Sequence, residues 1–482
     1  MQLPVIIPVL GILLILFSTS SIPPMVVALI YSEPEVSLFI YTFLITLSMG
    51  ILLRLPYRNT RIQMRNRDGF VVTVLLWIVL SAVGALPLLM METPSLTITD
   101  AFFESLSGLT TTGATILTGI DELPKSILFY RQQLQWLGGM GIIVLAVAIL
   151  PMLGIGGMQL YRTETPGPVK DKKLTPRITE TAKVLWYIYL GLTVACTAGY
   201  WLAGMNLFDA ISHSFSTVAI GGFSTHDASI GHYASPAIHT VAIFFMLISG
   251  VNFALHFIAW RGRSLKYYIQ DPEFKGYLLI LGMVTAITVP VLYFSAIYDL
   301  PDAIKHGVFE VVSVATTTGF ASTGFSTWPT FLPFLLFLTS FAGGCSGSTA
   351  GGMKVIRILL IFKQGMRELR RLVHPNAIFV IKLGGKSVNH RIGEAVWGFF
   401  SAYVVLFIVM FLGLMATGLD LETAFSTVAS CMNNLGPALG DATSNYQSLP
   451  DTAKWILCFA MLLGRLEIFT LIILFTPTFW RY

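Results

Sequence analysis

The chain has 482 residues, of which 55% are hydrophobic and only 11% are charged, and its formal net charge is +5. This composition is far too apolar for an ordinary soluble domain. We therefore expect a polytopic membrane protein that lies in lipid and has no nucleic-acid partner.

Ten hydrophobic runs follow one another along the chain, and each approaches the 20 or so residues that cross about 30 Å of hydrocarbon. Two leading runs cover Pro4–Ile30 and Val36–Leu55. The first has no basic start and no evident cleavage site, so we expect it to remain as a helix. The other eight come in pairs: Phe70–Leu89 with Leu134–Leu153, Val184–Met205 with Ala237–Trp260, Gly276–Ile297 with Phe331–Phe362, and Ala395–Met415 with Trp455–Phe479.

The charges between these runs are divided by sign. Of the 30 lysines and arginines, 23 lie in the loops 54–69, 158–183, 261–275 and 363–394 or at the C-terminus. The positive-inside rule assigns these loops, and with them both termini, to the cytoplasm. Of the 25 acidic residues, 16 lie on the opposite side, including Glu104 and Glu310. An outer mouth with this charge attracts cations.

Between the two runs of each pair, a serine is followed six residues later by a glycine. The four serine–glycine pairs are Ser107 with Gly113, Ser216 with Gly222, Ser313 with Gly319 and Ser430 with Gly436. Successive glycines are 109, 97 and 117 residues apart, which indicates an internal repeat of about a hundred residues. Small residues also allow close packing of membrane helices, and for one such segment that alternative is the simpler one. Four copies in register favour a pore.

A short, moderately apolar stretch precedes each glycine: Asp100–Leu109, Asp209–Ile220, Ala303–Ala315 and Glu422–Cys431. These stretches cannot cross the bilayer, so we expect half-helices that enter from outside and lead into re-entrant loops. Their C-terminal ends carry partial negative charge, which would stabilise a cation between them. Glycine adopts positive φ easily, and backbone carbonyls can replace the hydration shell of an ion. The sequence therefore predicts a carbonyl-lined filter.

Two features lie where the chain should pass below this filter. The run 331–362 would be about 48 Å long as one helix, and five glycines interrupt it: Gly343, Gly344, Gly347, Gly351 and Gly352. Each lowers helix stability by nearly 1 kcal/mol relative to alanine, so we expect an unwound polar loop, with Lys354 after it, that acts as a gate. Arg465 lies in another apolar run, at a cost of about 2.5–3.5 kcal/mol. We expect it to face the pore as a barrier; the alternative is a structural arginine paired with Glu467.

An intramembrane enzyme is the rival hypothesis from another class. The sequence has no His-Glu-x-x-His, no pair of intramembrane aspartates and no Gly-x-Ser-x-Gly with suitable partners. It also lacks a recognisable nucleotide-binding motif. A transporter without catalytic residues or cofactors is therefore expected.

Four helix–loop–helix units after two leading helices, a Gly/Ser-rich interruption in the third unit and Asn433-Asn-Leu-Gly436-Pro437 in the fourth resemble the Trk/Ktr/HKT superfamily of potassium transporters. Within it the bacterial TrkH type is the most similar, over essentially all 482 residues. The resemblance implies an all-α membrane protein of about ten transmembrane helices around a single pore. The implied divisions are 1–68 for the leading helices, 69–183, 184–275, 276–394 and 395–482 for pore repeats one to four.

The resemblance also implies potassium uptake across the bacterial inner membrane by a homodimer that binds a cytosolic, nucleotide-binding, TrkA-like regulatory subunit. The potassium ligands would be backbone carbonyls of Thr111, Thr112, Gly113, Ile220, Gly221, Gly222, Thr317, Thr318, Gly319, Asn434, Leu435 and Gly436. In plant relatives a serine at the first glycine accompanies sodium transport, so four glycines favour potassium. A sodium or non-selective monovalent cation transporter remains the alternative. The fourth segment lacks the threonine-rich run and departs furthest, and the choice between a channel and a symporter stays open.

Overall fold

The computed structural model describes residues 3–57, 66–144, 178–329 and 331–481. Within these ranges the chain is nearly all helical, and its strands are one short antiparallel hairpin, β1 (Lys382–Leu383) and β2 (Lys386–Ser387). The predicted all-α class is confirmed. Most of the predicted basic loop 158–183, and residues 58–65 of the loop 54–69, lie outside the described residues.

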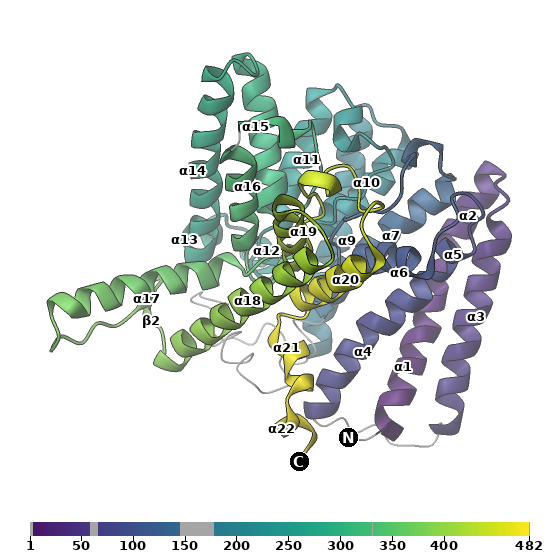
Figure 1. Cartoon of the computed structure of the whole chain (residues 1–482), viewed down its shortest axis with the longest axis horizontal. Coiled ribbons are helices and arrows are strands. Elements are labelled where there is room, and N and C mark those ends of the chain that lie inside the picture. The colour runs from purple at the N-terminus through teal and green to yellow at the C-terminus, as the bar shows by residue number, and fades with distance from the viewer. Residues whose placement is uncertain (1–2, 58–65, 145–177, 330, 482) are drawn as a thin grey trace.

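The leading residues form two apolar helical segments at one edge of the molecule (Figure 1). Their elements are α1 (Leu3–Ser18), η1 (Thr19–Ser21), α2 (Ile22–Tyr31), α3 (Val36–Arg54) and η2 (Leu55–Tyr57). Helices α1 and α3 approach closely at Gly11 and Gly50, where a side chain on either glycine would come within 2.8 Å of the other's carbonyl oxygen. Small residues at this contact allow the two backbones to approach.

Four units of long helix, short helix, loop and second helix follow. The first contains α4 (Asn66–Gly84), α5 (Leu86–Leu89), α6 (Ile98–Leu109), η3 (Ile120–Glu122) and α7 (Lys125–Val144). The second contains α9 (Ile178–Leu202), α10 (Leu207–Ala219), η5 (Ser229–His232), α11 (Pro236–Ser249), α12 (Phe253–Arg261) and α13 (Lys266–Gln270). The third contains α14 (Pro272–Phe294), α15 (Leu300–Ala315), η6 (Phe325–Thr327), α16 (Phe331–Ala342) and α17 (Val355–Val373). The fourth contains α18 (His390–Ala416), α19 (Leu421–Asn433), η7 (Gly440–Ala442), α20 (Asp451–Arg465), α21 (Phe469–Ile472), η8 (Ile473–Phe475) and α22 (Pro477–Trp480).

The short helices α6, α10, α15 and α19 are the predicted half-helices, and each begins at a polar cap. The capping side chains, which accept hydrogen bonds from backbone N–H groups two or three residues further on, are those of Thr97, Asn206, Asp299 and Asp420. These bonds satisfy N–H groups that the first turn of a helix leaves unpaired. Each helix also has an acidic residue in its first turn, where the helix dipole favours negative charge.

Among the described residues, six helices are long and apolar enough to cross a membrane, or eight if two bent pairs each count as one span. The bends separate α11 from α12 by 92° and α20 from α21 by 111°. We predicted Ala237–Trp260 and Trp455–Phe479 as single, continuous spans. Each is bent in the structure, so the prediction that they are continuous was wrong. The predicted span Leu134–Leu153 corresponds to the end of α7 and continues outside the described residues.

The second half of the third unit also differs from the prediction. Helix α16 ends at Ala342, and α17 begins at Val355 and runs to Val373, through the first 11 residues of the stretch 363–394 that we predicted as a basic loop. Helix α17 projects from the body of the molecule, and the N- and C-termini lie at the same end of it (Figure 1). A charged helix beyond the apolar run is thus a separate structural element.

Candidate functional site

Each short helix ends in the same main-chain motif. In the first unit the Thr112 N–H donates to the Ser107 carbonyl at 2.9 Å, and the Thr111 N–H donates to the Gly108 carbonyl at 3.0 Å. The equivalent bonds, at 2.8–3.3 Å, are Gly221 to Ser216, Ile220 to Thr217, Thr318 to Ser313, Thr317 to Val314, Leu435 to Ser430 and Asn434 to Cys431. This paired pattern is the Schellman motif, which ends a helix at a left-handed residue.

The recurring serine takes part in this motif through its main-chain carbonyl. The buried hydroxyls of Ser107, Ser216 and Ser430 have no hydrogen-bond partner among the described residues, whereas the Ser313 hydroxyl donates to the Phe320 carbonyl at 2.6 Å. The repeated spacing in the sequence therefore reflects a helix terminus, and the serine supplies a small side chain there.

Two residues of each loop have left-handed backbone. The glycines Gly113, Gly222, Gly319 and Gly436 have φ of +80°, +81°, +81° and +101°, respectively. The residues two positions earlier are Thr111, Ile220, Thr317 and Asn434, with φ of +50° to +65°. A β-branched residue with positive φ costs about 1–3 kcal/mol and occurs mostly at functional sites. Three of the four residues, Thr111, Ile220 and Thr317, are β-branched, whereas Asn434 is of a type that adopts this conformation more readily. Strain at the same place in three units indicates that this loop geometry is required.

The four loops close into a ring. A methyl group added to any of the first three glycines would overlap a carbonyl oxygen of the next unit, and one added to Gly436 would lie 2.7 Å from such an oxygen. The pairs are Gly113 with Gly221, Gly222 with Thr318, Gly319 with Leu435, and Gly436 with Thr112. The carbonyl in every pair belongs to the residue just before the next glycine, and the fourth unit contacts the first. The twelve predicted filter residues are thus adjacent segments of one ring.

Polar side chains on the short helices hold the chain that follows each glycine. Glu104 accepts hydrogen bonds from the Ile116 N–H at 2.9 Å and from the Thr115 hydroxyl, and Glu310 accepts one from the Ser322 N–H at 2.7 Å. The equivalent contacts in the second and fourth units are between His213 and the Ser224 hydroxyl, and from the Leu439 N–H to the Ser426 hydroxyl, each at 2.9 Å. These bonds fix the loops against the short helices.

Our assignment of Glu104 and Glu310 to a charged outer mouth was wrong. They are only 1% and 0% exposed, and Glu104 forms a buried ion pair with Arg131 at 2.8 Å. Their hydrogen-bond partners in the loops lie 11 to 13 residues away, beyond the glycine, and Arg131 lies 27 residues from Glu104, so the sequence alone did not indicate burial. Outside the membrane-embedded part, the Thr423 side chain and backbone N–H groups lower the pKa of the exposed Asp420 carboxyl, so this cap carries negative charge.

A cavity of about 470 Å³ opens on the side of the loops that follow the glycines. Three ring glycines line it, together with polar residues that include Arg131, His226, Asp227 and Asn445. We call this cavity the vestibule. It gives the ring a polar approach from the side on which the short helices begin.

On the other side of the ring lies the segment 343–354, between α16 and α17, which contains no helix. The Gly351 N–H donates to the Thr317 hydroxyl at 2.7 Å, and the Gly352 N–H donates to the Asn433 carbonyl at 3.1 Å. The Thr349 hydroxyl donates to the Val218 carbonyl at 3.0 Å. The segment is therefore hydrogen-bonded to the second, third and fourth units directly beside the ring. Lys354 donates back to the Ala350 carbonyl.

Arg465, the last residue of α20, connects this segment to the ring. Its Nη2 donates to the Thr111 hydroxyl at 2.6 Å, and its Nη1 donates to the Thr349 carbonyl at 3.3 Å. Arg465 is 5% exposed, and both of these partners are neutral. The Glu467 carboxylate instead pairs with Arg357 at 2.8 Å.

Two residues at the ring were missed in the sequence. The Gln135 side chain donates to the Gly221 carbonyl at 2.5 Å and accepts from the Phe223 N–H at 3.1 Å. The Tyr446 hydroxyl donates to the Gly436 carbonyl at 2.7 Å. Three glutamines at 132, 133 and 135 beside an apolar run were a usable signal, because amides at membrane depth need partners. Tyr446 follows its glycine by ten residues and gave no comparable signal.

Comparison with known proteins places this architecture in a family. The TrkH family profile, described as a cation transport protein, matches residues 36–482. The chain is 59% identical to the Trk system potassium uptake protein TrkH of Halomonas elongata over 100% of both chains. It is 58% identical to the Escherichia coli K12 protein of the same name over 98% of both.

A solved structure gives the same result. The crystal structure of the potassium transporter TrkH from Vibrio parahaemolyticus superposes with a TM-score of 0.93 and 54% identity, covering 100% of both chains. These matches confirm the predicted superfamily and fold class, and they exclude the rival enzyme. The chain belongs to the TrkH family of cation transport proteins.

Proposed function

We propose that the chain mediates potassium uptake across the bacterial inner membrane through a filter formed by Thr111–Gly113, Ile220–Gly222, Thr317–Gly319 and Asn434–Gly436. The observation that carries this proposal is the closed ring, in which four carbonyls each lie against the glycine of a neighbouring unit. Rings of backbone carbonyls can replace the hydration shell of a potassium ion. Four helix C-termini beside the ring add a potential that favours cations.

Potassium is preferred to sodium in this proposal because all four ring positions are glycine, and the relatives named above are potassium uptake proteins. The alternative, a sodium or non-selective monovalent cation transporter, would use the same ring with weaker discrimination. The fourth segment, Asn434-Leu435-Gly436, bears on this discrimination, because Asn434 and Leu435 lie where the first and third segments have threonines.

The proposed gate is the segment Gly343–Gly352 with Lys354, and the proposed barrier is Arg465. The segment lies under the ring, and Thr349 is 0% exposed there, as is Ala350. A conducting state must therefore move this segment or its contacts. Arg465 supports the closed arrangement, because its guanidinium binds the ring at Thr111 and the segment at Thr349.

The remaining parts of the proposal follow the family and the charge distribution. The chain acts as a homodimer with a cytosolic TrkA-like subunit that binds nucleotide, and both of its termini are cytoplasmic. The pore repeats span 69–183, 184–275, 276–394 and 395–482, after leading helices in 1–68. The regulator binds the basic stretches 158–183 and 363–394, the second of which includes the end of α17.

Ion flux into vesicles that contain the purified chain tests the function. We expect potassium to enter, and we expect equimolar external sodium to compete poorly. Growth of a potassium-transport-deficient bacterium on low potassium gives a second readout. Equal potassium and sodium fluxes would support the non-selective alternative, and no flux of either ion with a correctly folded chain would overturn the proposal.

A further inference from the structure

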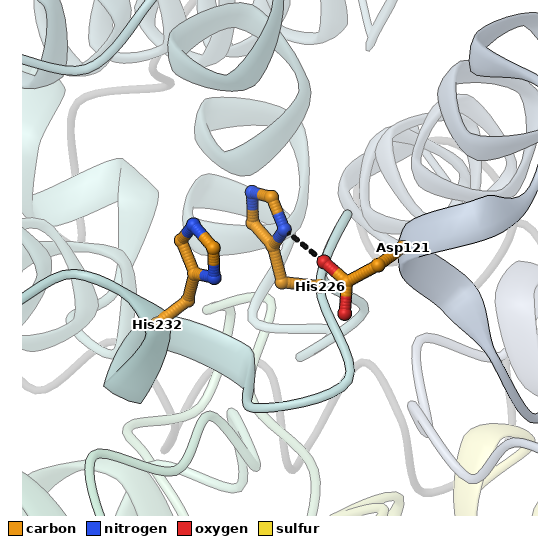
Figure 2. A group of neighbouring side chains, drawn as sticks. All are labelled: Asp121, His226 and His232. Atoms are coloured by element: carbon orange, nitrogen blue, oxygen red, sulfur yellow. Dashed lines mark hydrogen bonds and ion pairs between the residues drawn. The ribbon is translucent and has the colours of Figure 1, made fainter.

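A cluster of three possible metal ligands lies at the edge of the vestibule. Asp121 comes from η3 in the first unit, whereas His226 and His232 come from the loop and η5 of the second (Figure 2). One ligand atom from each residue can be chosen so that all three atoms lie within 4.8 Å of one another. A carboxylate and two imidazoles are a ligand set that suits zinc and similar divalent metals.

The imidazole of His226 lies between two carboxylates. Its Nδ1 contacts the Asp121 carboxylate, as Figure 2 shows, and its Nε2 lies 3.3 Å from Asp209 Oδ2 and 3.2 Å from the Tyr233 hydroxyl. A histidine that binds a metal usually donates its other ring N–H to a carboxylate in this way. The contact with Asp121 requires a hydrogen on Nδ1, so metal binding would release that hydrogen and place the ion between Nδ1 and the carboxylate, while the Nε2 hydrogen stays directed to Asp209.

The positioning carboxylate is itself fixed. Asp209 accepts hydrogen bonds from the Thr225 hydroxyl and the Tyr233 hydroxyl, both at 2.7 Å. Two hydrogen bonds from backbone N–H groups to side-chain carboxylates also join the two loops. The Asp227 N–H donates to the Asp121 carboxylate at 3.2 Å, and the Asp121 N–H donates to the Asp227 carboxylate at 3.5 Å. These bonds bring Asp121 to His226 without a metal.

His232 is the adjustable member of the cluster. Its ring stacks on that of His226 with centroids 3.6 Å apart and an angle of 1° between the planes. A metal ion lies close to the plane of each imidazole that binds it, so two parallel stacked rings cannot share one ion as they stand. His232 is exposed, and rotation of its side chain brings one of its nitrogens to the ion.

We propose that Asp121, His226 and His232 bind one divalent transition-metal ion, for which zinc is the representative, with water completing the coordination. This site goes beyond the proposed potassium transport and does not depend on it. It would join the outer loops of the first two units. Because His226 and Asp227 line the vestibule together with ring glycines, the bound ion adds positive charge on the path of potassium and reduces its entry.

Direct binding tests the site independently of transport. The metal-free purified chain is titrated with zinc chloride by calorimetry, and we expect one ion per chain. His232→Gln, which changes an exposed side chain, and Asp121→Asn should each weaken zinc binding by about tenfold or more. X-ray absorption at the zinc edge should show two imidazole nitrogens at about 2.0 Å in the wild type and one in His232→Gln.

His390 supplies the matched control. It is an exposed histidine 3.2 Å from the Glu394 carboxylate, without a second imidazole close by in the described part of the chain. His390→Gln should bind zinc as the wild type does. Equal zinc affinity in the wild type, His232→Gln and Asp121→Asn, or loss of binding in His390→Gln, would overturn the site.

Flux gives the second readout, with each variant compared with its own zinc-free rate. Zinc outside the vesicles should inhibit potassium entry through the wild type, and His232→Gln should need about ten times more zinc for the same inhibition. If no variant carries ions, the calorimetric titration still measures zinc binding. The experiments therefore distinguish an error in the transport proposal from an error in the metal-site proposal.

Discussion

At the scale of single residues, the ring glycines have no room for a side chain. Gly113 and Gly319 have φ of +80° and +81°, and a methyl group on either would overlap a carbonyl oxygen of the next unit. We expect Gly113→Ser and Gly319→Ser to displace those carbonyls and to lower the ratio of potassium to sodium flux by about tenfold, equivalent to about 1.4 kcal/mol. Flux measurements in vesicles with each ion check this prediction.

Gly324 is the control for that substitution, because it lies five residues beyond Gly319, has φ of −75°, and has no atom within 4 Å of an added methyl group. Gly324→Ser should keep the wild-type selectivity. Unchanged discrimination in both ring variants, at normal expression, would contradict the assignment of the filter.

Arg465 is the second residue whose effect can be stated in advance. A guanidinium about 6 Å from a passing cation, at an effective dielectric constant near 20, opposes the cation by about 3 kcal/mol, or about a hundredfold in local occupancy. Arg465→Ala removes this charge together with the bonds to Thr111 and Thr349, so maximal potassium flux should rise. Arg465→Lys keeps the charge and should stay near the wild type. A loss of flux in Arg465→Ala, with normal expression, would instead identify a structural arginine.

At the scale of elements, the segment between α16 and α17 should control the pore. Gly343 and Gly352 lie side by side, since a methyl group on Gly343 would be 3.1 Å from the Gly352 Cα, so removal of residues between them leaves ends that can be joined. Deletion of Ser346–Gly351 should raise flux and weaken its regulation. Thr349→Val, which removes only the bond to the Val218 carbonyl and its weaker neighbour at Ser249, should do so to a smaller degree.

Flux and its dependence on the regulator are measured for both variants in vesicles, after size-exclusion chromatography has verified folding. A filter variant cannot serve in place of the deletion variant in this test, because the filter also determines flux. Flux that is no higher and no less regulated in a folded deletion variant would exclude the gate.

The elements also show what the sequence could predict. The short helices were located to within a few residues, because a polar cap, an apolar stretch and a left-handed residue are local signals. The breaks after α11 and α20 were not predicted. At the first of them the Gly250 carbonyl accepts from the Cys345 N–H at 2.8 Å, and the Phe253 N–H donates to the Gly347 carbonyl at 3.1 Å. Partners almost a hundred residues away replace the helical bonds, and spacing within one run cannot reveal them.

Dependence on distant partners also explains which residues of the candidate site the sequence could predict and which it could not. The ring glycines were found because their spacing repeats. The Glu104–Arg131 pair and the Gln135 contact were not found, because they depend on how α7 packs against α6 and against the loop of the second unit. The length of α17 was missed because charged residues in a membrane protein were taken as evidence of a loop. A charged helix that leaves the membrane satisfies its own backbone and tolerates them.

At the scale of the whole molecule, α17 offers the proposed regulator a projecting surface. The helix projects from the body (Figure 1), and its last turns expose Leu369, Leu372 and Val373 beside Arg370 and Arg371. Apolar side chains next to positive charge are suited to a partner with an acidic, partly apolar surface. Movement of α17 would reach the proposed gate directly, since the helix begins at Val355, whose N–H donates to the Gly344 carbonyl at 3.1 Å.

Reversal of charge on this helix tests the coupling. The double variant Arg370→Glu, Arg371→Glu places negative charge on the proposed regulator-binding surface. Like charges across an interface cost several kcal/mol, so regulator binding should fall by more than about tenfold. Arg263→Glu, in the loop between α12 and α13, is the control and should keep the regulator. Affinity purification from native membranes measures binding, and vesicle flux with and without nucleotide measures coupling. If the regulator copurifies equally with both variants, α17 is not part of the interface. If no soluble partner is recovered with the wild-type chain, regulation by a separate subunit is contradicted.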